Sequence, residues 1–228
     1  MTKSEPTKLL IRSRFPRAAA AYRHVRAALF RRSLTDVFSE IYHTNAWKDA
    51  ESVSGRGSTL ERTGAIMSQL PTVAKELKIE TLLDAACGDF NWMSQTNLDD
   101  LKYIGIDVVP DLIKRNETLY ASDRRSFIVA DITRSTLPNA DAILCRDCLI
   151  HLSFRSIGAA ITNFKKTRAR YLMCTTHSLV TANLDIPDGS WRNVNLQLAP
   201  FSFPEPFSLI VEDVEIGKGL GIWRMEDL

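Results

Sequence analysis

Several acidic side chains stand where apolar runs of this sequence end. Asp84 follows Thr81–Leu83 and leads through small residues to Gly88, while Asp107 ends the run that begins at Tyr103. The two acids are 23 positions apart (107 minus 84). An acid at the end of a second strand, roughly 20 residues beyond a glycine turn, is placed to accept hydrogen bonds from both hydroxyls of an adenosine ribose. The spacing therefore predicts a site for an adenosine-like ligand.

The apolar runs predict the elements that position these acids. Strands are expected over 81–86, 102–107, 126–131, 140–146 and 169–175, and helices near 90–96, 110–118 and 153–166. Strands that alternate with short helices form a parallel sheet with right-handed crossovers. The tail differs, because 208–214 and 220–225 predict an antiparallel hairpin at the sheet edge. The fold class is therefore α/β, with ligands expected at the carboxyl ends of the strands.

Two regions lie outside that alternation. Before the first strand we expect a helix over 34–47 and a second one that starts at Ser58, with Ser58 and Glu61 as a capping box and Pro71 kinking or ending it. The polar-aromatic stretch 181–207 contains four prolines. An irregular segment of this length inside a domain is usually a functional loop.

The stretch Asp84-Ala-Ala-Cys-Gly-Asp-Phe90, followed by Asp107 and Asp131, resembles the motifs of the class I, Rossmann-like S-adenosyl-L-methionine-dependent methyltransferases. The resemblance covers about residues 78–228. It implies a sheet of order 3-2-1-4-5 that a C-terminal antiparallel hairpin closes. It also implies that Asp107 binds the ribose and that Asp131, with Ile132, contacts the adenine.

The same resemblance extends to two further segments. Cys145–His151 matches the motif that lines the junction of methyl donor and acceptor, and the loop Ser52–Ser58 with Trp47 is similar to a segment that covers the methionine moiety in a bacterial subgroup. The cofactor-binding residues implied are Trp47, Ser54, Gly55, Asp84, Ala86, Gly88, Phe90, Asn91, Asp107, Asp131, Ile132 and Arg146.

The glycine turn departs from the pattern of that family. Ala86 and Phe90 occupy the first and third glycine positions, so only Gly88 remains for the closest approach of backbone to ligand. Phe90 implies a rearranged turn. A dinucleotide fold needs the glycines of G-x-G-x-x-G around its phosphates. S-adenosylmethionine has no phosphate, so a single glycine can suffice.

Two histidines and one acid are candidates for catalysis. His151 and His177 each follow a strand that ends on the ligand side, and a neutral imidazole can take a proton from an attacking hydroxyl or amine. Asp147 could orient the donor or the acceptor. Each histidine could instead have a structural role. The acceptor is expected to contact His177, Trp191, Arg192 and Asn193, unless these last three only pack a long loop.

The cysteines could suggest a metal site. Cys145-x-x-Cys148 has the spacing of a zinc ligand pair, and Cys87 and Cys174 stand on neighbouring strand ends. A pair with one member still inside a strand rarely has ligand geometry, and cysteine packs well as a small apolar residue. We therefore expect no metal and no disulfides, which suits a reducing cytoplasm.

The charge is unevenly distributed along the chain. Residues 1–32 carry nine Lys or Arg against Glu5 alone, a balance of +8, so the rest of this +2 chain sums to −6. We divide the chain into a basic helical N-terminal extension with a cofactor-covering loop, 1–57, and a methyltransferase domain, 58–228. The extension could be solvated or docked, lie on a membrane, bind nucleic acid or act as a transit peptide. No apolar run is long enough to cross a bilayer.

The resemblance implies transfer of a methyl group to an oxygen or nitrogen acceptor, with a small molecule or saccharide expected. One alternative is an RNA or protein methyltransferase recruited by the basic extension, which would bind nucleic acid with a steep salt dependence. Another is a non-catalytic module that binds the cofactor. The fourth strand lacks an Asn-Pro-Pro-Tyr sequence, which disfavours methylation of the amino groups of DNA bases.

Overall fold

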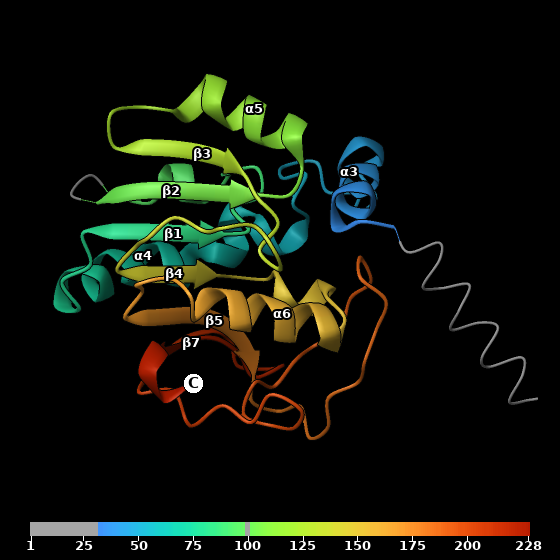
Figure 1. Cartoon of the computed structure of the whole chain (residues 1–228), viewed down its shortest axis with the longest axis vertical. Helices are drawn as coiled ribbons and strands as arrows, with labels where there is room; N and C mark the ends of the chain where they lie inside the picture. Colours follow the sequence, from blue (N-terminus) through green and yellow to red (C-terminus); the bar gives the residue numbers. More distant parts are fainter. Residues whose placement is uncertain (1–31, 99–100) are drawn as a thin grey trace, which may run out of the picture. The chain divides into compact units, whose positions relative to one another are not determined.

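The computed structural model describes residues 32–98 and 101–228. Most of the basic extension lies outside these residues, so the expectations for it stay predictions, as does the division at residue 57. Leu34–Leu228 form one unit. Its centre is a seven-stranded sheet of order β3-β2-β1-β4-β5-β7-β6 (Figure 1).

The sheet confirms the expected topology. The strands β1 (Thr81–Ala85), β2 (Lys102–Asp107), β3 (Arg125–Val129), β4 (Ala142–Cys145) and β5 (Tyr171–His177) run parallel. The hairpin strands are β6 (Ser208–Asp213) and β7 (Lys218–Arg224), and β7 pairs antiparallel with β5. All five parallel strands therefore end at one edge, toward helix α3 (Leu34–Thr44) in Figure 1.

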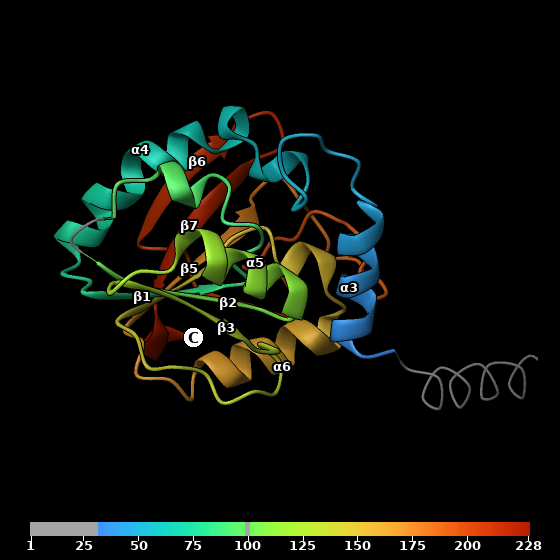
Figure 2. The same ribbon diagram turned by 90° about the horizontal axis from the view of Figure 1, so that it is seen from above.

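Helices cover both faces of the sheet (Figure 2). Helix α6 (Phe154–Phe164) packs against the face that carries Leu83, and α4 (Leu60–Glu76) packs against the face that carries Leu82. Successive strand residues point to opposite faces, and both faces are apolar because each is buried. Helix α5 (Pro110–Tyr120) lies over β3 and β2.

Short 3₁₀ turns replace or join some of the expected helices. They are η1 (Arg56–Ser58), η2 (Met93–Gln95), η3 (Leu149–His151) and η4 (Met225–Asp227). The helix expected over 90–96 is wrong, because only η2 forms there. Phe90 has a φ of 60°, a left-handed conformation that an α-helix cannot accommodate.

Helix α4 starts later than expected and is continuous. Its cap residue is Thr59, and the backbone N–H of Leu60 donates to Oε1 of Glu51 at 2.7 Å. The capping box of Ser58 and Glu61 is therefore wrong. Pro71 lies inside the helix rather than at its end.

The segment 181–207 contains no helix or strand, as expected. It is nevertheless held tightly, because Val194, Leu196 and Phe203 are buried in the core beneath α6. No described helix is long and apolar enough to span a bilayer.

Candidate active site

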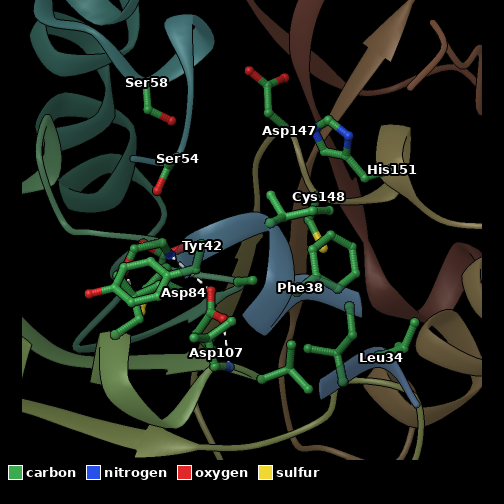
Figure 3. A pocket seen from close by; sticks show the side chains of 18 of the residues that line it. Leu34, Phe38, Tyr42, Ser54, Ser58, Asp84, Asp107, Asp147, Cys148 and His151 are labelled. Atoms are coloured by element: carbon green, nitrogen blue, oxygen red, sulfur yellow. Dashed lines mark hydrogen bonds between the residues drawn. The ribbon is translucent and has the colours of Figure 1, made fainter. Parts of the chain in front are cut away.

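A pocket lies where the parallel strands end, and we call it the first pocket (Figure 3). It encloses about 1020 Å³ of empty space, counting its open mouth. Its lining from the strand ends consists of Asp84, Ala86, Cys87, Gly88, Asp107, Val108, Val109, Ala130, Asp131, Ile132, Arg146, Asp147 and Cys148. The topology therefore brings most of the expected cofactor residues to one place.

Asp107 is fixed at the floor of this pocket. Its Oδ1 accepts a hydrogen bond from the N–H of Val109 at 3.0 Å, and its Oδ2 accepts one from the N–H of Gly88 at 3.2 Å. Burial raises the pKa of Asp107 to about 6, although these backbone donors oppose the shift. Each carboxylate oxygen can accept a further hydrogen bond. Asp107 can thus bind a pair of hydroxyls without moving.

Asp84 lies deeper, at the end of β1. The hydroxyl of Tyr103 donates to its Oδ2 at 2.6 Å. Burial raises the pKa of Asp84 to about 7, and the hydrogen bond from Tyr103 counteracts only part of this effect. A buried carboxyl with such a pKa would favour a cationic ligand group, whose charge would stabilise the ionised form.

Asp131 is partly committed to its own turn. Its Oδ1 accepts hydrogen bonds from the backbone N–H and hydroxyl of Thr133, and its Oδ2 lies 2.9 Å from Nε of Arg134. The apolar side chains of Ala130 and Ile132 line the pocket beside it. An aromatic base would therefore meet an apolar wall with a carboxylate at its rim.

The loop 52–58 is anchored by Asp89, a residue that the sequence reasoning did not single out. Both oxygens of the Asp89 carboxylate accept from Oγ of Ser52, and they also accept from the N–H of Val53 and Oγ of Ser54. Ser54 in turn accepts the backbone N–H of Asp89 at 2.9 Å. The carboxylate of Asp89 therefore holds Ser54 at the pocket wall. The sequence signal for this role was the position of Asp89, one residue after Gly88.

Helix α3 forms a wall of the first pocket that the sequence reasoning did not assign. Leu34, Phe38, Ile41 and Tyr42 line the pocket, and Figure 3 labels the side chains of Leu34, Phe38 and Tyr42 around it. These four residues are half-buried, and Leu34 and Phe38 also pack against the core beside the cavity. The sequence showed a stripe of apolar residues at helical spacing here, but it did not show that this stripe lines a pocket.

A second pocket adjoins the first, and the two share Trp47, Ser54, Ser58, Asp147 and His151. The second pocket is more polar in its residues. Its remaining lining is Gly55, Arg56, Gly57, Arg62, Ile150, His177, Trp191, Asn193, Glu212, Asp213, Ile216 and Lys218. The expected contacts His177, Trp191 and Asn193 therefore meet here.

Asp147 stands at the junction of the two pockets and is held by two cations. Nζ of Lys218 lies 2.6 Å and Nη1 of Arg146 lies 3.1 Å from its Oδ2, and the hydroxyl of Thr175 donates to its Oδ1. Burial favours the neutral carboxyl, but the two positive charges outweigh it and lower the pKa of Asp147. Arg146 also donates to Glu212 and to the carbonyl of Gly57. Arg146, assigned to the cofactor from sequence, thus has its donors on protein acceptors.

His151 lines both pockets with its ring stacked on Trp47, at a centroid distance of 4.8 Å. Its Nδ1 lies 2.9 Å from the carbonyl oxygen of Ser190. Because a carbonyl only accepts, Nδ1 carries the proton and Nε2 holds a lone pair. Burial lowers the pKa of His151, so the imidazole is neutral near pH 7. The second histidine, His177, is buried, and its Nδ1 lies 3.3 Å from the carbonyl oxygen of Val194.

Three expected site residues lie outside the linings of both pockets. The ring of Phe90 is buried against Tyr103 and Phe127, with centroid distances of 5.0 and 5.2 Å. The amide of Asn91 donates to Glu51 and to the carbonyl of Ser58.

Arg192 is buried instead of facing an acceptor. Its guanidinium donates to the carbonyls of Leu149, Leu152 and Leu184. It ties the segment 181–207 to η3, and so it acts on the site only through the loop that it holds. Among the described residues, no three His, Cys, Asp or Glu side chains are grouped to hold a metal ion.

Comparison with solved structures assigns the fold. The chain has the class I, Rossmann-like methyltransferase fold. It superposes on the methyltransferase domain of bacterial CtHen1 with a TM-score of 0.56 at 16% identity, over 73% of this chain and 98% of that one. It superposes on magnesium protoporphyrin IX methyltransferase (ChlM) from Synechocystis PCC 6803, a structure with bound SAM, with a TM-score of 0.55 at 12% identity, over 86% and 99%. No family model matches the sequence, and no curated protein does.

Proposed function

We propose that this protein is an S-adenosylmethionine-dependent methyltransferase that acts on an oxygen or nitrogen of a small-molecule acceptor, saccharides included. One observation carries the proposal. A pocket with acids at three successive strand ends adjoins a second, polar pocket, and Asp147 and His151 line both. Two cavities that share such residues are what a reaction between two bound molecules requires.

The residues of the first pocket fit S-adenosylmethionine in their chemistry. Asp107 is proposed to accept both ribose hydroxyls, and Ala130 and Ile132 to pack on the adenine. Asp84 is proposed to receive the cationic methionine end, which would favour its ionised form. When bound, the cofactor would supply a methyl group carried on a sulfonium sulfur. Its carbon–sulfur bond would break and leave the electron pair on sulfur, while a lone pair of the acceptor forms the new bond to the methyl carbon.

The protein residues contribute position and a proton acceptor. Nε2 of His151 is proposed to take the proton of the acceptor hydroxyl or amine, while Ser190 keeps the imidazole in the required tautomer. The ionised Asp147 can accept a hydrogen bond from the acceptor and so orient it. Alignment of two reactants can supply roughly 7–11 kcal/mol of barrier reduction.

Calorimetry with adenosylhomocysteine tests the cofactor site. Asp107→Ala should weaken binding by about 1.5–3 kcal/mol, which is about 10- to 150-fold, because two charge-assisted hydrogen bonds are lost and water in the vacated space recovers part of their energy. Asp123→Ala is a matched control, since Asp123 is exposed and precedes β3 at the opposite ends of the strands. Equal affinity of wild type and Asp107→Ala would refute the site.

Transfer of a labelled methyl group to a broad acceptor panel tests catalysis. His151→Gln should bind adenosylhomocysteine like the wild type but transfer more slowly to hydroxyl acceptors by about 10²–10⁴-fold. Cofactor binding without any transfer would favour a non-catalytic module. Transfer to RNA or protein alone, lost on deletion of residues 1–32, would favour the polymer-directed alternative.

A further inference from the structure

The floor of the second pocket contains a buried acceptor atom that lacks a donor. The side chain of Glu212 is 2% exposed. Its Oε2 forms ion pairs with Nη2 of Arg146 at 2.5 Å and with Nζ of Lys218 at 3.4 Å. Its Oε1 is buried and has no hydrogen-bond partner in the described part of the chain. Buried acceptors are nearly always paired, so this one calls for a donor from a ligand.

A second unpaired acceptor atom belongs to a residue that lines the same pocket. Oδ1 of Asn193 is also buried and without a partner among residues 32–98 and 101–228. Asn193 and Glu212 come from the irregular segment 181–207 and from β6, so two independent elements present unsatisfied oxygens here. A ligand with several hydroxyl or N–H donors matches both.

The charges of the pocket floor cancel. The cations Arg146 and Lys218 are engaged by the anions Asp147 and Glu212, with contacts between 2.5 and 3.4 Å. The further pair Arg62 and Asp213 lies 3.4 Å apart at the rim, and Arg56, another cation of the lining, is exposed to water. A charged ligand buried beside a neutral cluster loses its hydration without gaining a counter-charge. The floor therefore suits an uncharged ligand.

Two exposed apolar side chains also line the pocket. The indole of Trp191 is 62% exposed and Ile216 is 40% exposed, and both line the pocket. An aromatic ring exposed beside a polar pocket offers an apolar surface to the flat face of a ring. The pocket thus combines an apolar platform at its mouth with hydrogen-bond acceptors on its floor.

We propose that the second pocket binds an uncharged, hydroxyl-rich ring, a saccharide-like acceptor, with one hydroxyl donating to Oε1 of Glu212, another engaging Asn193, and one ring face on Trp191. This inference rests on the proposed function, because the reacting hydroxyl must lie beside His151. Glu212 is then a specificity-determining residue. Its unpaired Oε1 selects for a ligand with a hydrogen-bond donor, and the balanced charges of the pocket floor select against uronates and amino sugars.

The test uses the full chain saturated with adenosylhomocysteine and measures binding by tryptophan fluorescence and calorimetry. The probes are matched sets of glucose, galactose and mannose methyl glycosides with the corresponding uronates and 2-amino sugars. At least one neutral glycoside should bind about tenfold or more tightly than both charged members of its set. Failure of every neutral glycoside to bind, or a preference for a charged member, would overturn the inference.

Substitutions at two positions separate recognition from folding. Trp191→Ala should lose glycoside binding while Trp191→Phe keeps most of it, and neither should unfold the protein because the side chain is mostly exposed. Glu212→Gln removes one negative charge from the floor, so the neutral glycoside should weaken and the matching uronate should strengthen. An unchanged order of preference in Glu212→Gln would contradict the role of Glu212.

These outcomes are distinct from failure of the proposed function. If adenosylhomocysteine does not bind the wild type, the proposed function fails before any glycoside is added. If it binds and Asp107→Ala weakens it, but no neutral glycoside binds, the cofactor site stands and only the acceptor class is wrong.

Discussion

The loop 52–58 should depend on a single buried carboxylate. Asp89→Asn keeps the size of the side chain but removes its charge, and it places an amide donor where only acceptors are wanted. Three groups of the loop donate to the carboxylate: Oγ of Ser52 at 2.9 Å, the N–H of Val53 at 2.9 Å and Oγ of Ser54 at 3.1 Å. We expect the closed loop to lose stability relative to an open, hydrated one.

The size of the effect follows from these contacts. Hydrogen bonds to a charged group contribute about 1.5–3 kcal/mol each, but the amide keeps part of them and water replaces others when the loop opens. A net loss of about 2 kcal/mol reduces the closed fraction by up to about 30-fold. If only the closed loop completes the first pocket, the apparent Kd for adenosylhomocysteine rises by up to the same factor.

The assay is calorimetry on folded protein, with Asp49→Asn as the control. Asp49 caps the start of the same loop, where its Oδ1 accepts the N–H groups of Glu51 and Ser52, and neither hydrogen bond involves Asp89. The control should lose less than about 1 kcal/mol of binding free energy. An Asp89→Asn variant that binds as tightly as the wild type would refute the assignment of this loop to the ligand.

Three further substitutions test other parts of the site. Asp84→Asn should gain stability over the wild type in urea unfolding as the pH rises from about 4 to about 8, because burial raises the pKa of Asp84 from 3.8 to about 7 and the wild type loses stability between these two values. Phe90→Ala should lower the free energy of unfolding by about 3–5 kcal/mol, while the folded variant binds adenosylhomocysteine normally. Weaker binding would show that the side chain of Phe90 contributes to the first pocket. Arg192→Met should lower the free energy of unfolding by about 2–4 kcal/mol in chemical denaturation, because buried carbonyls lose their donor, and an unchanged stability would contradict its structural role.

The fold and the acids of the first pocket could be predicted from the sequence because both leave local signals. Apolar runs locate buried strands, and an acid directly after such a run must lie at the carboxyl edge of a parallel sheet. Asp84, Asp107 and Asp131 were found in this way. The strand order came from the resemblance and was confirmed by the pairing of the strands.

Phe90 shows where a motif match misleads. Its place in the motif predicted a cofactor contact, but its ring turns into the aromatic cluster with Tyr103 and Phe127. The backbone does take the left-handed conformation that a glycine would favour, with a φ of 60°. Burial of an aromatic side chain offsets the strain of that conformation. The motif therefore predicted the backbone and not the side chain.

Glu212 was not found, although the sequence carried a signal for it. It lies two residues after Ile210, a spacing that indicates the same, buried face of a strand, and its side chain is buried even though the pairing of β6 is irregular between Val211 and Asp213. A charged residue on the buried face of a strand needs a counter-charge, and the sequence could not say which of the many arginines and lysines supplies it. The partner is Arg146, at the end of a different strand 66 positions away.

Asp147 shows why the location of an acid is easier to predict than its charge state. Its backbone is left-handed, with a φ of 50°, a conformation that aspartate tolerates better than most residues. Its N–H donates to the hydroxyl of Thr175, 28 positions away, and its carboxylate accepts a hydrogen bond from the ammonium group of Lys218, 71 positions away. A Cβ on Gly57 would come within 2.9 Å of that carboxylate, so the loop must approach as glycine. The strand end puts the acid at the junction of the pockets, and the charges of Arg146 beside it and of Lys218 on β7 keep it ionised there.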